Sequence, residues 1–229
     1  MKTYLKLRIT FGLISAGLLI TLLFKLTKVP GGMILSGLFL GVIVIVGIVL
    51  GCLILTGILK FFFKQSSFLT IFSITTSISF LAFHYQLYSP TLTIKVPNNY
   101  IGEVNLVLSN VKDNLLTVDS NGIAYLNKWT FEKTYAKPIV IQEDGKNLDK
   151  NLIGFDQSGF FGYGKSCCIN GQQIENKNFE IVPDSLFGQK QYYSKDLTTL
   201  VDRKLVHLSH LDEHTIIDSL TVKIESEKK

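Results

Sequence analysis

The hydrophobic positions of this chain follow two different patterns, and the first is a series of long apolar runs. These runs lie at about residues 9–27, 33–59 and 68–88. An α-helix needs roughly 20 mainly apolar residues to cross the core of a bilayer, and each run approaches or exceeds that length. Turn-forming and polar residues separate the runs, as connections between helices require. The pattern therefore predicts a membrane domain, residues 1–90, with three transmembrane helices.

The second pattern begins after Ser89, where apolar and polar residues alternate as they do in half-buried β-strands. The first alternating series covers residues 92–96, and the second covers 103–108. Further strands are expected at residues 115–118, 123–126, 138–141, 179–182 and 220–224. Short strands separated by turn residues predict a mainly-β, sandwich-like domain over residues 91–229.

Residues 91–142 also resemble a known kind of domain. The carrying residues are Lys95-Val96-Pro97-x-x-Tyr100-x-Gly102-x-Val104-x-Leu106, followed by Asn121-Gly122-Ile123-Ala124-Tyr125-Leu126. They are similar to the opening of small bacterial β-sandwich domains of transthyretin-like appearance, some of which are carried by exported or membrane proteins. The resemblance implies a β-sandwich fold, and it carries over no catalytic residue.

Charge is distributed as unevenly as hydrophobicity. The chain has 23 basic and 18 acidic residues and a net charge of +5, yet every acidic residue lies at or after Glu103. The basic residues of the membrane domain flank its apolar runs, where they face lipid headgroups. A nucleic-acid surface would instead need basic residues clustered on the folded domain. We therefore expect a lipid bilayer as a partner and no nucleic acid.

The flanking charges also predict an orientation. The N-terminus and the second loop lie on one side of the membrane and hold Lys2, Lys6, Arg8, Lys60 and Lys64. The opposite side holds only Lys25, Lys28 and Lys95. Because cytoplasmic loops carry the excess of Lys and Arg, the N-terminus is expected in the cytoplasm. Three spans then place the C-terminal domain outside it.

The first apolar run raises one alternative to this topology. Basic residues precede the run, as in a signal peptide, but it ends in Phe24-Lys25 without a small-x-small cleavage site. We therefore favour an uncleaved helix.

The abundance of Lys, Asn and Ile is typical of AT-rich bacterial genomes. The sequence thus predicts a multi-pass protein of a bacterial inner (plasma) membrane, with its C-terminal domain in the cell envelope.

Small residues recur four apart in the second run. They are Gly37, Gly41, Gly47 and Gly51. Such spacing lets helix backbones approach closely, either between two copies of the chain or among its own helices, and we favour the second.

No charged residue lies deep in any run, whereas ion and proton paths normally need one. A small channel or transporter subunit remains an alternative, supported only by the hydroxyl-rich third run.

One motif of nucleotide chemistry occurs, at residues Gly159 to Ser166, which match the pattern Gly-x-x-x-x-Gly-Lys-Ser. A phosphate-binding loop needs a buried strand before it and a helix after it. Here a poor strand precedes the motif, and the hairpin signal Asn170-Gly171 follows it. We therefore interpret the segment as a β-hairpin and expect neither a nucleotide nor a cofactor.

Cysteines and histidines supply the remaining candidate chemistry. Cys167 and Cys168 are adjacent, and they are either a vicinal disulfide or two structural thiols on opposite sides of a strand.

Apolar residues recur at helical spacing from Leu197 to Leu211, which predicts the only helix of the second domain. On that helix the side chains of His207, His210 and His214 would lie close together, in a possible metal site with Asp212 or Glu213. If the segment is instead a strand, His207 and His210 point to opposite faces.

These observations leave two main functional hypotheses. The leading one is a non-enzymatic, membrane-anchored domain that binds an envelope protein or a ligand, because no catalytic motif is found. The alternative is a metal-dependent envelope enzyme that uses the three histidines.

Overall fold

A computed structural model describes residues 2–27, 36–154, 160–189 and 195–210. The chain divides into two compact units, a helical unit that ends at Ser89 and a second unit that begins at Pro90. Each unit is described by itself.

The helical unit consists of α1 (Lys2–Leu26), α2 (Gly37–Phe62) and α3 (Phe68–Gln86). All three helices are long and apolar enough to cross a membrane. Large apolar side chains such as Leu13 and Ile54 are exposed on the surface of this unit. Surfaces of this kind are typical of helices that face lipid. The three predicted helices are thereby confirmed, and the protein is membrane-associated.

Hydrogen bonds between hydroxyl groups connect α3 to both other helices. Toward α1, Ser15 and Thr76 share a hydrogen bond of 3.1 Å, and the Ser77 hydroxyl donates to the Phe11 carbonyl at 3.0 Å. Toward α2, Thr56 and Thr75 lie 3.3 Å apart at their hydroxyl oxygens. The remaining hydroxyl side chains of α3 are also hydrogen bonded. The polar groups of the third helix therefore serve the packing of the bundle.

The glycines of α2 do not share one environment. A Cβ atom at Gly41 would collide with the side chain of Leu26, so α1 and α2 pack closely there. Gly47 and Gly51 are exposed and have no heavy atom of another residue within 4 Å of a Cβ position. Gly37 is buried as well. Packing within the chain therefore accounts for Gly41, whereas Gly47 and Gly51 remain open.

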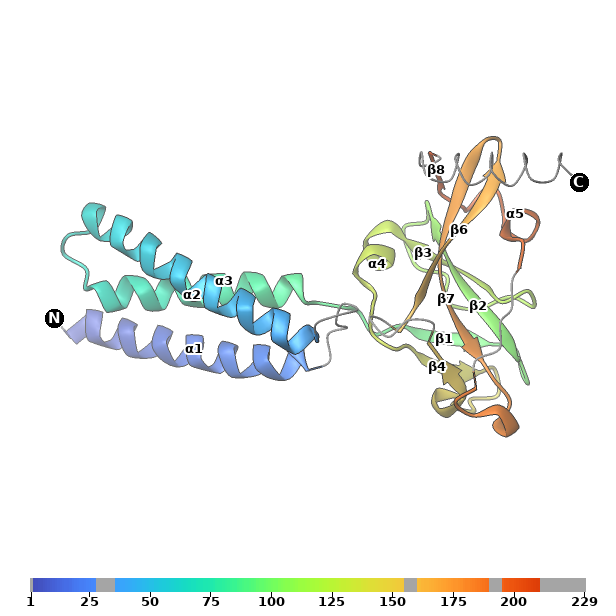
Figure 1. The fold of residues 1–229 in the computed structure, drawn as a ribbon, viewed down its shortest axis with the longest axis horizontal. Coiled ribbons are helices and arrows are strands. Elements are labelled where there is room, and N and C mark those ends of the chain that lie inside the picture. Colours follow the sequence, from blue (N-terminus) through green and yellow to red (C-terminus); the bar gives the residue numbers. More distant parts are fainter. Residues whose placement is uncertain (1, 28–35, 155–159, 190–194, 211–229) are drawn as a thin grey trace, which may run out of the picture. The chain divides into compact units, whose positions relative to one another are not determined.

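The second unit is built around a mixed β-sheet (Figure 1). Its strands are β1 (Thr93–Val96), β2 (Gly102–Ser109), β3 (Ile123–Asn127), β4 (Ile139–Gln142), β5 (Leu152–Ile153), β6 (Gly162–Ile169), β7 (Gln172–Ile181) and β8 (Leu208–Ser209). Strand β7 pairs antiparallel with β2, β5, β6 and β8, while β2 pairs in parallel with β3. Strands β1 and β4 form a separate parallel pair.

The two sheets share a buried core, which makes the unit sandwich-like. Alternate residues of β2, Val104 and Leu106, pack into this core with Ile94 of β1 and Val140 of β4. The opposite face of β2 contributes Val107 to a second core beside α5 (Leu197–Leu200). Helices plus a C-terminal mainly-β domain are thus confirmed. The parallel pairs were not expected, because alternation alone does not reveal strand direction.

The predicted helix from Leu197 to Leu211 is wrong beyond Leu200. After that residue the chain turns, Val206 bridges to Ser109, and the His207 amide donates to the Leu108 carbonyl at 2.9 Å. Strand β8 then pairs with β7. The end of β2 and the start of β7 supply the backbone hydrogen bonds that a helix would have supplied. The apolar residues of the segment still pack into the second core, although most of the segment is not helical.

Other expectations differ in detail. Three short helical elements were not anticipated, namely α4 (Lys128–Lys133) and the 3-10 turns η1 (Asp149–Asn151) and η2 (Asp184–Leu186). Residues 115–118 make isolated bridges and no full strand, and residues 220–224 lie outside the described part of the chain. The expected hairpin at Asn170-Gly171 is present, and both turn residues have positive φ angles.

Candidate functional site

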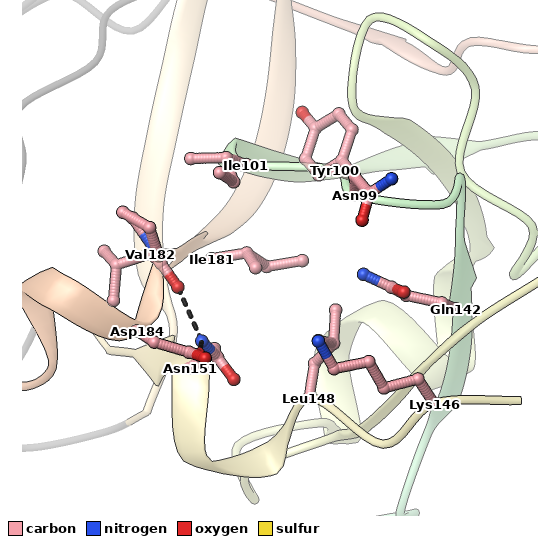
Figure 2. Close-up of a pocket in the computed structure, with 11 residues that line it drawn as sticks. Asn99, Tyr100, Ile101, Gln142, Lys146, Leu148, Asn151, Ile181, Val182 and Asp184 are labelled. Atoms are coloured by element: carbon pink, nitrogen blue, oxygen red, sulfur yellow. Dashed lines mark hydrogen bonds between the residues drawn. The ribbon is translucent and has the colours of Figure 1, made fainter.

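The candidate site is a pocket where four segments of the β-domain meet (Figure 2). We call it the amide pocket, because carboxamide side chains dominate its polar lining. It has a volume of about 170 Å³. Its lining residues are Asn99, Tyr100, Ile101, Gln142, Lys146, Leu148, Asn151, Ile181, Val182, Pro183 and Asp184.

Two tight turns form one side of the amide pocket. Asn99 ends the turn after β1 with a φ angle of 58°, a left-handed conformation that asparagine tolerates. The turn after β4 contains Gly145. In this turn the backbone amide of Gln142 donates to the backbone carbonyl of Lys146 at 2.8 Å. The Asn98 side chain accepts a hydrogen bond from the Asp144 amide at 3.0 Å. Because this bond connects the turns, Asn99 and Lys146 are held on a common frame.

Asn151 fixes the other side. Its Nδ2 donates to the Val182 carbonyl at 2.8 Å and to Asp184 Oδ1 at 2.9 Å. The Val182 amide in turn donates to the Asn151 carbonyl at 2.9 Å. These three bonds hold the end of β7 against η1. The floor between the two sides is apolar, with the buried side chains of Leu148 and Ile181.

Gln142 distinguishes this pocket from an ordinary surface depression. Its side chain is only 5 % exposed, and Figure 2 shows its amide directed into the pocket. No described residue forms a hydrogen bond with that amide, and its nitrogen and oxygen are open to the pocket space. Asn99 and Lys146 also reach the pocket without a side-chain partner among the described residues. The site thus offers hydrogen bonds that the protein leaves unused.

Tyr100 belongs to the frame of the pocket. Its hydroxyl donates to the Glu103 carbonyl at 2.6 Å and accepts from Lys195 Nζ at 3.1 Å. Burial raises the pKa of the Tyr100 phenol to about 12, with further contributions from the charges of Asp119 and Glu103. The phenol is therefore neutral at physiological pH and keeps donating its hydrogen bond.

A second, larger hollow of about 520 Å³ lies between α4 and strands β6 and β7. Its charged groups are mostly engaged with one another or with the backbone. Lys177 Nζ donates to the Thr134 carbonyl at 2.5 Å and lies 5.2 Å from the ring centre of Phe131. Burial lowers the pKa of Lys177. Tyr163 donates to Glu175. These interactions leave this hollow fewer free groups for a ligand than the amide pocket has.

The predicted metal ligands are not brought together by a helix. His207 lines the larger hollow, and its Nδ1 is 2.7 Å from Asn110 Oδ1. His210 follows β8 and is exposed, while His214 lies outside the described residues. Across the described ranges, no group of three or more His, Cys, Asp or Glu side chains is placed to hold a metal ion.

The other two motifs occupy one strand. In the phosphate-loop pattern, Gly164 to Ser166 lie inside β6, and the strand continues to Ile169 where a nucleotide site would need a helix to begin. Cys167 and Cys168 are exposed and joined as a vicinal disulfide, the first of the two alternatives that the sequence left open.

The residues of the amide pocket gave no signal in the sequence. Asn99, Gln142, Lys146 and Asn151 match no motif, and Asn99 lies far before the other three in the chain. Asn99 and Lys146 lie in turns, and in a sequence such residues indicate only where one strand ends and the next begins. Only the pairing of β1 with β4 and of β5 with β7 assembles them.

Comparison with known proteins adds little to this description. No family model and no curated protein matches the chain. Among solved structures, a crystal structure described as "Putative Lipoprotein from Bacillus anthracis" is similar, with 14% sequence identity and a TM-score of 0.27. The similarity covers 59% of this chain and 95% of that one. A likeness of this size supports no conclusion about this chain.

Proposed function

We propose that this protein is a membrane-anchored binding protein of the bacterial cell envelope, in which the amide pocket holds a ligand. The observation that carries the proposal is the Gln142 side chain, which is largely enclosed and directs an amide without a partner among the described residues into the pocket. A few polar groups placed in a partly apolar pocket fix the orientation of a ligand. Carboxamides orient ligands but do not transfer protons at neutral pH, so the pocket favours binding over catalysis.

The helical unit fits an anchor better than a conducting path. Its hydroxyl side chains are engaged between helices or with their own backbone, as Ser15, Thr76 and Ser77 illustrate. A path for ions needs polar groups that remain free to replace water around the ion. The bundle therefore supports the β-domain and leaves recognition to it.

A thermal-shift screen of small polar molecules tests the binding proposal. We would use the full chain in lipid nanodiscs and follow the fluorescence of Trp129, the only tryptophan, which lies in α4 of the β-domain. At least one compound should raise the melting temperature of the wild type and not that of Gln142→Met. Gln173→Met is the matched control, because Gln173 is equally buried but does not line the pocket. If every stabilising compound acts equally on all three proteins, the amide pocket is not the site.

We further propose that the N-terminus is cytoplasmic and the β-domain lies outside the cytoplasm of a bacterial inner membrane. The excess of Lys and Arg on the N-terminal side supports this orientation. In a cysteine-free chain, a single cysteine at exposed Lys112 should react with a membrane-impermeant maleimide in spheroplasts. A cysteine at Lys64, in the second loop, should react only after lysis. The reverse pattern would place the domain in the cytoplasm.

Self-association through α2 is a second partner proposal, now limited to Gly47 and Gly51. Both are exposed and open, and together they form a Gly-x-x-x-Gly pair on the surface of α2. Gly47→Ile with Gly51→Ile should lower the crosslinked dimer fraction in membranes. Gly17→Ile on α1, which is also open, is the control. An unchanged dimer fraction, or no dimer in the wild type, would rule out this seam.

A further inference from the structure

We infer that the ligand of the amide pocket is an apolar α-amino acid residue with a free carboxylate, held by Lys146, Gln142 and Asn99. This inference rests on the proposed binding function and specifies its chemistry. The ligand has two possible sources, a free amino acid and the last residue of a peptide chain, which share this chemistry.

The carboxylate is assigned from the donors that converge in the pocket. Figure 2 shows the Lys146 ammonium, the Gln142 amide and the Asn99 amide around one common space. They come from two different turns, and none of these side chains has a partner among the described residues. Lys offers only donors, and an amide can present its N–H groups. One cation with flanking amide donors matches the two oxygens of a carboxylate.

The opposite side of the pocket suits the nitrogen of an amino acid. Asp184 lines it, and its carboxylate already accepts from Asn151 Nδ2 at 2.9 Å. A carboxylate has capacity for further donors, so an ammonium group or a peptide N–H of the ligand fits there. No ion pair joins Lys146 to Asp184 within the described residues. The two charges therefore remain available to the opposite ends of one ligand.

The floor and the volume set the side chain and the size. Leu148 and Ile181 are buried beneath the ligand space, and Ile101 is 52 % exposed at its edge. An apolar ligand side chain would cover Ile101 and leave the polar groups on either side in place. The volume of about 170 Å³ is below the roughly 300–1,000 Å³ of pockets for drug-sized ligands. A single amino acid residue is of suitable size.

The frame of the pocket favours binding without a large rearrangement. The Asn98–Asp144 hydrogen bond connects the two turns that carry the donors, and Asn151 holds the end of β7. A site that is already ordered loses less conformational entropy when the ligand enters.

Isothermal titration of the full chain in nanodiscs with a matched pair of probes tests the inference. N-acetyl-L-leucine has a free carboxylate, and N-acetyl-L-leucinamide has the same shape without the charge. We expect the acid to bind roughly tenfold or more tightly than the amide, since hydrogen bonds to charged groups are the stronger ones. Equal affinity for the two probes would overturn the carboxylate assignment and leave the proposed binding function intact. If neither probe binds, the inference fails, and the compound screen described above then decides the proposed function separately.

Two further probes distinguish the sources. L-leucine carries a free ammonium group for Asp184, whereas acetyl-Gly-Gly-Leu places a peptide N–H there. Tighter binding of L-leucine supports a free amino acid as the ligand, and tighter binding of the tripeptide supports a chain end. Binding of either one with carboxylate selectivity supports the inference.

Variants assign the effect to residues. Lys146→Met should weaken binding of N-acetyl-L-leucine roughly tenfold and remove the preference over the amide. Lys146 is exposed, so this change leaves the fold intact. Lys150→Met is the matched control, because Lys150 is exposed nearby but does not line the pocket. Equal loss in both variants would show that Lys146 holds no carboxylate and would overturn the inference.

Discussion

The helical unit and the β-domain both enclose polar side chains, and they use them differently. In the bundle, hydroxyl groups such as those of Ser77 and Thr76 are satisfied by a neighbouring helix. In the amide pocket, Asn151 is satisfied in the same way, but Gln142, equally enclosed, is not. The engaged groups hold structure together, because removing one leaves its partner unsatisfied. The unengaged group joins no two parts of the fold, and we propose that it serves a ligand.

The largest expected effect concerns the engaged carboxamide. Asn151→Leu should lower the free energy of unfolding by about 2 kcal/mol, because the Val182 carbonyl and Asp184 lose their donor. Denaturation of the full chain followed by Trp129 fluorescence measures this change. The neighbouring variant Lys150→Met should stay within about 0.5 kcal/mol of the wild type, as surface substitutions usually do. Equal effects would mean that Asn151 does not fix the end of β7.

The engaged phenol of Tyr100 should give a pH-dependent effect. Its pKa is about 12 in the folded protein and about 10 in the unfolded chain, so folding favours the neutral form. The contribution is complete below pH 10 and is lost as pH rises to about 12. Allowing for solvent screening, we expect the wild type to lose about 1–2 kcal/mol more than Tyr100→Phe over that interval.

Chemical denaturation of both proteins from pH 8 to pH 12, followed by Trp129 fluorescence, provides the measurement. The difference between the two proteins removes the contribution of titrating groups that do not contact Tyr100. Parallel pH curves would show that Tyr100 is not held as a neutral donor.

Gln142 should respond with the opposite sign. Gln142→Met keeps the length of the side chain and places an apolar group in a largely enclosed position where the amide has no protein partner. Hydrophobic burial should then raise the free energy of unfolding by about 1 kcal/mol. The same variant should lose ligand binding. A gain in stability together with a loss of binding is typical of a residue kept for function. If Gln142→Met is destabilising, the amide has a structural role and the comparison with Asn151 fails.

The smallest effect is expected in the bundle. Ser77→Ala removes the hydrogen bond to the Phe11 carbonyl and should destabilise the helical unit by about 0.6 kcal/mol, the average for such bonds between membrane helices. Thermal or steric-trap unfolding in bicelles can resolve this change. Ser66→Ala, in the loop between α2 and α3, serves as the reference. A loss well above about 2 kcal/mol would mean that the hydroxyl does more than join α1 to α3.

The membrane helices were predictable because their cause is local. A bilayer requires about 20 apolar residues in each spanning helix, and that requirement appears directly in the sequence. Strands β1 and β2 were visible for a similar reason, since alternate residues of each pack into the first core. The short strands β5 and β8 were not visible, because two residues carry no periodicity.

The segment after Leu200 shows where local reasoning fails. Its apolar spacing fits a helix, yet Val206 and Leu208 meet the edges of β2 and β7, which supply backbone hydrogen bonds. The hypothesis of a histidine metal site depended on that helix. Because the segment is not helical there, His207 lies beside Asn110. The candidate site is a stronger example, because no motif marks Gln142 or Lys146.

The sequence by itself determined the division of this protein into three membrane helices and a strand-rich domain, because hydrophobic periodicity follows from the solvent that each residue meets. The tertiary structure alone decided which polar groups are engaged. Ser77 and Asn151 gain partners from distant segments, while Gln142 and Lys146 of one turn face an open space together with Asn99 of another turn. A hydrogen bond is satisfied by what lies within about 3 Å in space, and only the fold determines that distance.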